Sequence, residues 1–207
     1  SGRTGRLMDY YYTVEQRATA EFKDRGSRFI ACLIPLGSAD DFKKEMDSVK
    51  KVFPKATHYC FAYRIGLDGN NYRVSDAGEP SGTAGKPIFG LIESRQLTNV
   101  LIVVVRYFGG SLLGVPGLIN AYRSASALVL QTVPVIQKSV ERQYRLHFDY
   151  TILNAIMIII KQYNCSIAEQ QLQLFCTMTI GIPQNRVEEV LFKLKEVRGL
   201  EISAEPG

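Results

Sequence analysis

Residues that could bind a negatively charged group follow an apolar run near the middle of the chain. Arg106 and Tyr107 come directly after the run at 100–105, and a glycine-rich stretch follows them. Glycine lets a ligand approach the backbone closely, and the amides that open a helix lack intrahelical partners and carry partial positive charge. The pattern predicts an anion site in which Arg106 supplies a full charge. The residues expected around the anion are Arg106, Tyr107, Gly109, Gly110, Gly114 and Gly117.

Hydrophobic periodicity predicts the elements on either side of these glycines. The run at 100–105 is short and rich in β-branched residues, which is typical of a strand buried on both faces. Apolar residues at 118–131 recur at helical spacing. We therefore expect a strand, a glycine-rich loop and a helix. A tight connection without any ligand would have the same signature.

A second polar loop, SDAGEPSGTAGKP at 75–87, offers carboxylates, hydroxyls and a lysine. Asp76 and Glu79 are the candidates for a catalytic general base, since polar loops on a rigid scaffold often carry function. The alternative is a rigid connection in which one of these carboxylates caps the next helix. The loop does not match a nucleotide-binding P-loop, because Pro80 and Pro87 stand where that motif needs a glycine and a hydroxyl residue. The ligand-binding residues expected here are Ser81, Gly82, Thr83 and Lys86.

The alternating segment at 57–66 predicts a strand, joined by a turn at 68–70 to a return strand that contains Arg73. His58 and Cys60 share one face of the first strand. A Cys–His nucleophile is less favoured here than an ordinary strand face, because activation needs an orienting acid. We expect His58 and Arg73 to add to the ligand site.

Two motifs carry a resemblance to a known family. VVVRYFGGSLLGVPGLINAYRSA at 103–125 and SDAGEPSGTAGKP upstream of it closely resemble the signature of the YigZ/IMPACT family. The chain resembles the bacterial two-domain form. The resemblance implies an α+β fold, with an N-terminal domain similar to the second domain of ribosomal protein S-five. It implies a C-terminal domain similar to the last domain of elongation factor G.

The remaining pattern predicts two domains, at 10–134 and 135–207, after a start at 1–9 that we expect to be disordered and partly derived from cloning. The second domain has the order βαββαβ, the ferredoxin-like signature. The strands expected in the first domain are 19–23, 27–36, 57–66, 72–74 and 100–105, with helices at 39–52, 87–97 and 118–131. Those of the second are 139–150, 166–171, 174–182 and 200–204, with helices at 152–163 and 186–197.

The composition is that of a globular protein, with 46% apolar and 22% charged residues. No apolar run approaches the ~18 residues of a membrane span. The four cysteines form no CxxC pair and no secretory signal is visible, which favours a reduced, cytoplasmic protein. Neither a metal site nor a cofactor is expected. The net charge is +5, and all of the excess lies in residues 1–134.

Three functions fit these features. The first, which the family resemblance implies, is an RNA- or ribosome-associated regulator of translation or the stress response. It would bind a phosphate backbone or nucleotide at the glycine-rich loop. The second is a hydrolase or phosphotransferase for a small phosphorylated ligand, with Glu79 or Asp76 as base. The third is a protein-interaction module. We rank the regulator of translation above the hydrolase or phosphotransferase, so an enzymatic function is the less favoured prediction.

Overall fold

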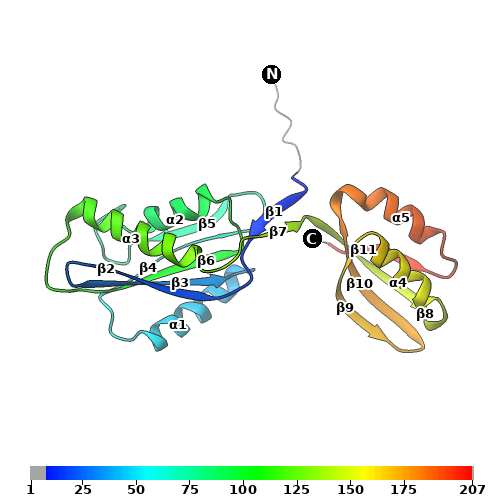
Figure 1. The fold of residues 1–207 in the computed structure, drawn as a ribbon. Coiled ribbons are helices and arrows are strands. Elements are labelled where there is room, and N and C mark those ends of the chain that lie inside the picture. The colour runs from blue at the N-terminus through cyan, green and yellow to red at the C-terminus, as the bar shows by residue number, and fades with distance from the viewer. Residues whose placement is uncertain (1–7, 207) are drawn as a thin grey trace, which may run out of the picture. The chain divides into compact units, whose positions relative to one another are not determined.

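The computed structural model describes residues 8–206, so most of the start predicted at 1–9 lies outside the described residues. The chain forms two compact α+β units. One is made of Tyr11–Lys138, and the other combines the chain from Ser139 onward with the described residues up to Tyr10. The predicted division after residue 134 falls shortly before this boundary. Figure 1 shows the helices and strands of each unit.

The first unit is built on a five-stranded antiparallel sheet with the order β2-β3-β6-β4-β5. Its central strand is the apolar run singled out in the sequence, and every residue from Val100 to Val105 is buried. The strands are β2 (Ala18–Asp24), β3 (Ser27–Pro35), β4 (His58–Ile65), β5 (Asn71–Ser75) and β6 (Val100–Tyr107).

Helices cover both faces of this sheet, which is why β6 is apolar on both sides. The helices α2 (Gly85–Ser94) and α3 (Gly114–Leu130) lie on one face, and α1 (Phe42–Val52), preceded by a short 3-10 turn, lies on the other (Figure 1). Successive side chains of a strand point to opposite faces. Arg106 therefore points to the α2 and α3 face and Tyr107 to the α1 face.

The second unit has the predicted ferredoxin-like order βαββαβ. Its antiparallel sheet has the strand order β11-β8-β10-β9, and both helices contribute to a single core with it. Short 3-10 turns precede both helices. The elements are β8 (Glu141–Asp149), α4 (Leu153–Gln162), β9 (Ser166–Leu172), β10 (Phe175–Pro183), α5 (Val187–Lys195) and β11 (Glu201–Ala204).

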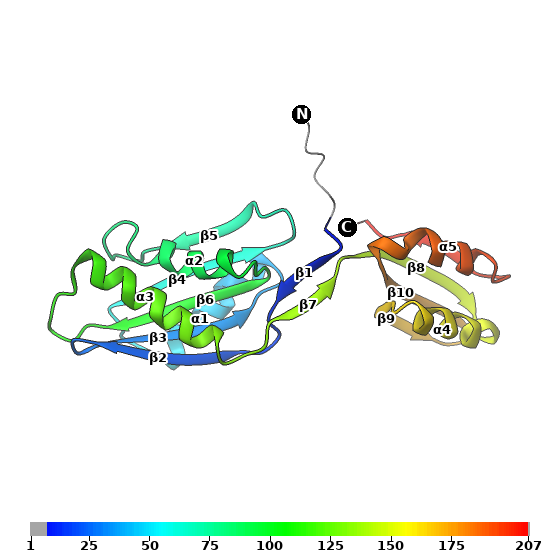
Figure 2. The ribbon, with the colours of Figure 1, turned by 45° about the horizontal axis from the view of Figure 1, so that its top comes forward.

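Two features differ from the sequence prediction. The helix α3 begins at Gly114, earlier than the expected residue 118, because a glycine and a proline are tolerated in the first turn of a helix. The strands β1 (Tyr10–Thr13) and β7 (Ile136–Ser139) pair in a sheet of their own, side by side in Figure 2. That pairing was not predicted, since local periodicity carries no information about a partner so distant in sequence.

Candidate functional site

A cavity of about 380 Å³ lies between the loop that follows β5 and the start of α3. The charged residues that line it are His58, Glu79 and Arg106, from β4, the loop and the end of β6. Its other walls include apolar side chains from the segment 108–118. The structure thus brings together three of the residues that the sequence assigned to a site.

Arg106 and His58 both contact the same carboxylate oxygen of Glu79. Glu79 Oε1 lies 2.6 Å from Arg106 Nη1 and 2.6 Å from His58 Nε2. The side chains of Glu79 and Arg106 are only 2% and 7% exposed. Arg106 is therefore not the free phosphate ligand that we expected, because Glu79 already offsets its charge.

His58 makes a hydrogen bond and an ion-pair contact. His58 Nδ1 lies 2.7 Å from the carbonyl oxygen of Ala77, which can only accept, so Nδ1 donates. Nε2 lies 2.6 Å from Glu79 Oε1, which accepts a hydrogen bond from Arg106, and this contact is an ion pair when the imidazole is protonated. When the imidazole is protonated, the cluster holds two positive charges and one negative charge. Buried charge without full compensation is costly, and an added anion would relieve that cost.

Two buried atoms of the cluster have no hydrogen-bond partner among residues 8–206: Glu79 Oε2 and Arg106 Nε. Two aromatic rings contact the Arg106 guanidinium: its Cζ lies 5.4 Å from the centre of the Phe29 ring and 5.6 Å from that of Phe108. The guanidinium is thus fixed in place without using all of its donors.

Free backbone amides border the cavity at the start of α3. The amides from Gly110 to Val115 donate no hydrogen bond within the described part of the chain. Gly110 and Gly114 have φ angles of 90° and 71°, which explains glycine at both positions. The first turn of α3 contains no acidic residue, so its partial positive charge is not neutralised locally.

Arg25 is a further cation near this helix start that the sequence analysis did not identify. A Cβ atom placed on Gly117 would lie 3.2 Å from Arg25 Nη2. The Arg25 side chain is 54% exposed and contacts the Asp24 carboxylate at 3.3 Å. The turn between β2 and β3 places Arg25 beside the start of α3. The sequence of that turn carries no signal that α3 is close to it.

Asp76 has a structural role rather than the role of a base. Its carboxylate accepts hydrogen bonds from the amides of Gly82, Ala84 and Gly85, at 2.9 to 3.1 Å, where α2 begins. Burial opposes the charged form, but these amide bonds outweigh it and lower the pKa of Asp76. The capping alternative therefore describes Asp76, whose two carboxylate oxygens both accept from amides of its own loop.

In acid, protonation of Asp76 is expected to release these three amides. Because its folded-state pKa is lowered, the stabilisation is present above the unfolded-state pKa and is lost as the pH falls through the folded-state value. The amide chemical shifts of Gly82, Ala84 and Gly85 should titrate together below pH 3.8, the ordinary value for the group. The Asp76→Asn variant should not show this step. A shared midpoint above 3.8 would contradict the capping role.

Cys60 is not an activated nucleophile beside His58. Burial raises the pKa of the Cys60 thiol to about 12, and its sulfur donates to the carbonyl of Asp76 at 3.1 Å. It also lies 3.3 Å from the hydroxyl of Tyr122. A buried, protonated thiol packs as a small apolar group.

The structure places several predicted ligand residues outside the cavity. The Arg73 guanidinium lies 5.3 Å from the ring centres of Phe42 and Phe61, on the α1 face. Tyr107 is on the same face and donates to the carbonyl of Pro54 at 3.0 Å. The remaining polar loop residues do not line the cavity: Ser81 and Lys86 are exposed, the Gly82 amide binds Asp76, and the Thr83 hydroxyl binds the carbonyl of Pro80.

Close packing of the backbone explains why residue 109 is a glycine. A Cβ atom at this position would lie 2.0 Å from the carbonyl carbon of Gly26. Its amide donates to the Ser27 hydroxyl at 3.1 Å, so it is not available to a ligand. Of the glycines in the predicted loop, Gly110 and Gly114 lie where free amides border the cavity, and Gly117 lies beneath Arg25.

The comparisons with known proteins agree with the fold. The model of the Impact N-terminal domain matches residues 25–130, the segment that holds the cavity. YigZ of Escherichia coli is 33% identical over 172 residues, which are 82% of this chain and 84% of YigZ. The chain belongs to the IMPACT family.

Further matches extend over both units. An IMPACT family member of Haemophilus influenzae is 30% identical over 191 residues, which cover 91% of this chain and 93% of the relative. A crystal structure of a hypothetical protein shares 31% identity and a TM-score of 0.72, covering 97% of this chain and 99% of that one. This IMPACT protein therefore shares the two-unit architecture with a solved structure.

Neither a metal site nor a membrane span is found in the part of this IMPACT protein that the structure describes. Among residues 8–206, no cluster of three or more His, Cys, Asp or Glu could hold a metal ion. None of the helices in this range is long and apolar enough to cross a bilayer.

Proposed function

We propose that this IMPACT protein takes part in regulating translation by binding a phosphate group, from RNA or a nucleotide, at the start of α3. The observation that carries the proposal is the cluster of His58 with the buried side chains of Glu79 and Arg106, in which one carboxylate oxygen contacts both the guanidinium and the imidazole. The cluster lines the same cavity as Gly114, where the amides of α3 have no partner.

A phosphate fits this arrangement for electrostatic reasons. The free amides and the dipole of α3 favour negative charge, and Arg25 adds an exposed cation beside them. The Arg106 guanidinium also lies at the cavity, but Glu79 and Ser27 hold its terminal nitrogens and its Nε is buried. An anion would thus find the oriented amides of α3 and, when His58 is protonated, would compensate the excess positive charge of the cluster.

The hydrolase alternative has less support. A general base must reach the proton that it removes. Glu79 Oε1 is already held by two cations, and Glu79 Oε2 is buried away from solvent. Asp76 is bound to the amides of its own loop. Both candidate carboxylates are therefore occupied or enclosed.

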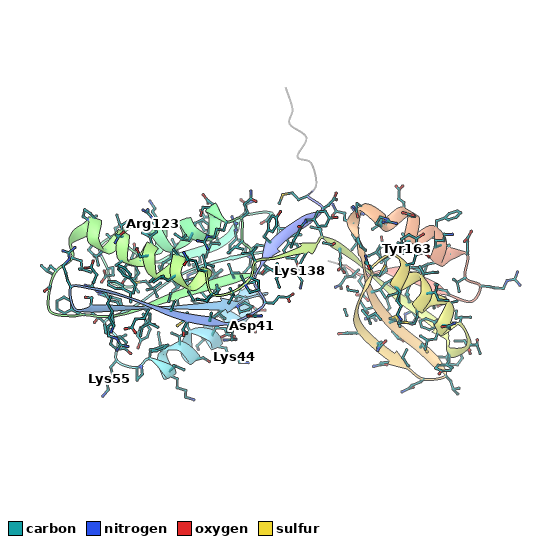
Figure 3. All side chains as sticks on the ribbon, viewed as in Figure 1. Asp41, Lys44, Lys55, Arg123, Lys138 and Tyr163 are labelled. Atoms are coloured by element: carbon teal, nitrogen blue, oxygen red, sulfur yellow. The ribbon has the colours of Figure 1, made fainter. Side chains whose placement is uncertain are left out.

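The outer surface of α1 does not offer a second phosphate track. Its exposed lysines share this surface with Asp47, and Asp41 directly precedes the helix; Lys44 and Asp41 are labelled in Figure 3. Mixed charges of this kind do not create the basic stripe typical of nucleic-acid binding. The proposal therefore concerns one local site.

Replacing Arg25 with asparagine is expected to weaken phosphate binding about fivefold, which corresponds to the loss of one exposed charge contact. Asparagine tolerates the positive φ of 46° at this position, so the turn should fold normally. Affinities for a mononucleotide and for a short single-stranded RNA can be measured by calorimetry at two salt concentrations.

Lys23→Gln is the matched control, because it removes the same charge from the neighbouring strand β2. It should leave the affinity within twofold. Binding to either probe should weaken as salt increases. Equal affinities of wild type, Arg25→Asn and Lys23→Gln, or an affinity that does not depend on salt, would refute the phosphate site. The probe that binds more tightly identifies the source of the phosphate.

A further inference from the structure

We propose that the cavity binds a nucleotide as a unit, with its base stacked on Phe108 and its phosphate at the start of α3. This inference rests on the proposed phosphate site and adds the part of the ligand that the site selects. It assigns a binding role to a side chain that the sequence analysis passed over.

Phe108 is presented to the cavity in a fixed position. It follows β6 directly, lines the cavity and is 50% exposed. Its amide donates to the Thr57 hydroxyl at 3.1 Å, which anchors the backbone. The Arg106 guanidinium lies over its ring, with Cζ 5.6 Å from the ring centre. A ring supported in this way and half open to solvent is a platform on which a base can stack.

The rim of the cavity is unusually apolar for a site that binds only phosphate. Leu112 and Val115 line the same cavity and are 87% and 52% exposed. Inorganic phosphate would cover none of this apolar surface. A base attached to the phosphate would cover part of it, and a cavity of about 380 Å³ lies within the range of small-molecule sites.

The charge of the cavity favours a nucleotide over an apolar peptide segment. An apolar peptide could offer carbonyl oxygens to the free amides at Gly114 and Val115, but it would bring no negative charge to the start of α3 or to the cluster of His58, Glu79 and Arg106. A nucleotide supplies an aromatic face for Phe108 and oxygen acceptors for these amides.

The test compares adenosine 5′-monophosphate with ribose 5-phosphate, which lacks the base, using the full chain and calorimetry. Wild type should bind the nucleotide about tenfold more tightly, the scale of one base–aromatic stacking contact. Phe108→Leu should lose this preference, measured as the ratio of its affinities for the two ligands. Phe108→Tyr retains a ring and should keep the preference, which separates stacking from a change in the fold.

Each outcome decides between the two proposals. If wild type binds both ligands equally, the base is not recognised and this inference fails, while the phosphate site stands. If Phe108→Leu keeps the preference, stacking on Phe108 is refuted. If neither ligand binds, the phosphate site itself is refuted for small ligands. An apolar peptide that binds wild type at this rim while the nucleotide does not would also overturn the inference.

Discussion

Replacing Glu79 with alanine should destabilise the first unit by about 3–5 kcal/mol, the cost of leaving buried charges without their counterion. The substitution removes the only carboxylate bound to Arg106 and His58 within the described residues. The Arg106 guanidinium is 7% exposed, so water cannot readily replace that carboxylate. Urea unfolding followed by circular dichroism would measure the loss.

A triple variant gives the matched control for the Glu79 prediction. When Glu79→Leu is combined with Arg106→Met and His58→Leu, no buried charge remains, and most of the lost stability should return. Glu79→Gln keeps the shape of the side chain but not its charge, so it should fall between wild type and Glu79→Ala. A cost below about 1 kcal/mol for Glu79→Ala would show that the cluster is not coupled to folding.

Replacing Gly109 with alanine should cost at least about 3 kcal/mol or prevent the first unit from folding, because the new methyl group would overlap the backbone. The added Cβ would lie 2.0 Å from the carbonyl carbon of Gly26 and 2.3 Å from the amide nitrogen of Ser27. These are main-chain atoms of the turn between β2 and β3. They cannot move aside as a flexible side chain would, so the turn must separate from the end of β6.

Alanine substitutions at two other glycines provide controls for the stability loss expected of Gly109→Ala. Gly90 lies in α2, is exposed and has no atom within 4 Å of the position that a Cβ would take, so Gly90→Ala should stabilise the protein by about 1 kcal/mol. Gly110 also has open space, but its φ of 90° should make Gly110→Ala cost about 1–2 kcal/mol. A Gly109→Ala variant no less stable than Gly110→Ala would contradict the steric argument.

The order and type of most elements could be predicted from the sequence because their signals are local. The apolar run of β6 indicated a strand buried on both faces, and the alternation after residue 139 indicated the ferredoxin-like unit. These patterns arise from burial of one or both faces of an element. The start of α3 was placed too late, because glycine and proline at 114–117 are poor evidence for a helix but acceptable in its first turn.

The sequence predicted several residues of the candidate site but not the contacts between them. His58, Glu79 and Arg106 were each candidates, yet the sequence suggested Glu79 as a base and the other two as ligand-binding residues rather than one cluster. Their shared oxygen depends on the register of β4 with β6 and on the path of the loop after β5. Asp76 and Glu79 looked equivalent in the loop, and only the amides around Asp76 distinguish them. Arg25 has no local signal at all.

The pairing of β1 with β7 brings the entry and exit of the first unit to one place. The amide of Val140 donates to the carbonyl of Asp9 at 2.7 Å, so the two strands are joined just outside their ends as well. A domain whose two ends lie close together can be inserted into a surface loop of another protein without distorting the fold of that protein. Residues 11–138 could therefore be inserted into another protein as one folded domain that retains the cavity at the start of α3.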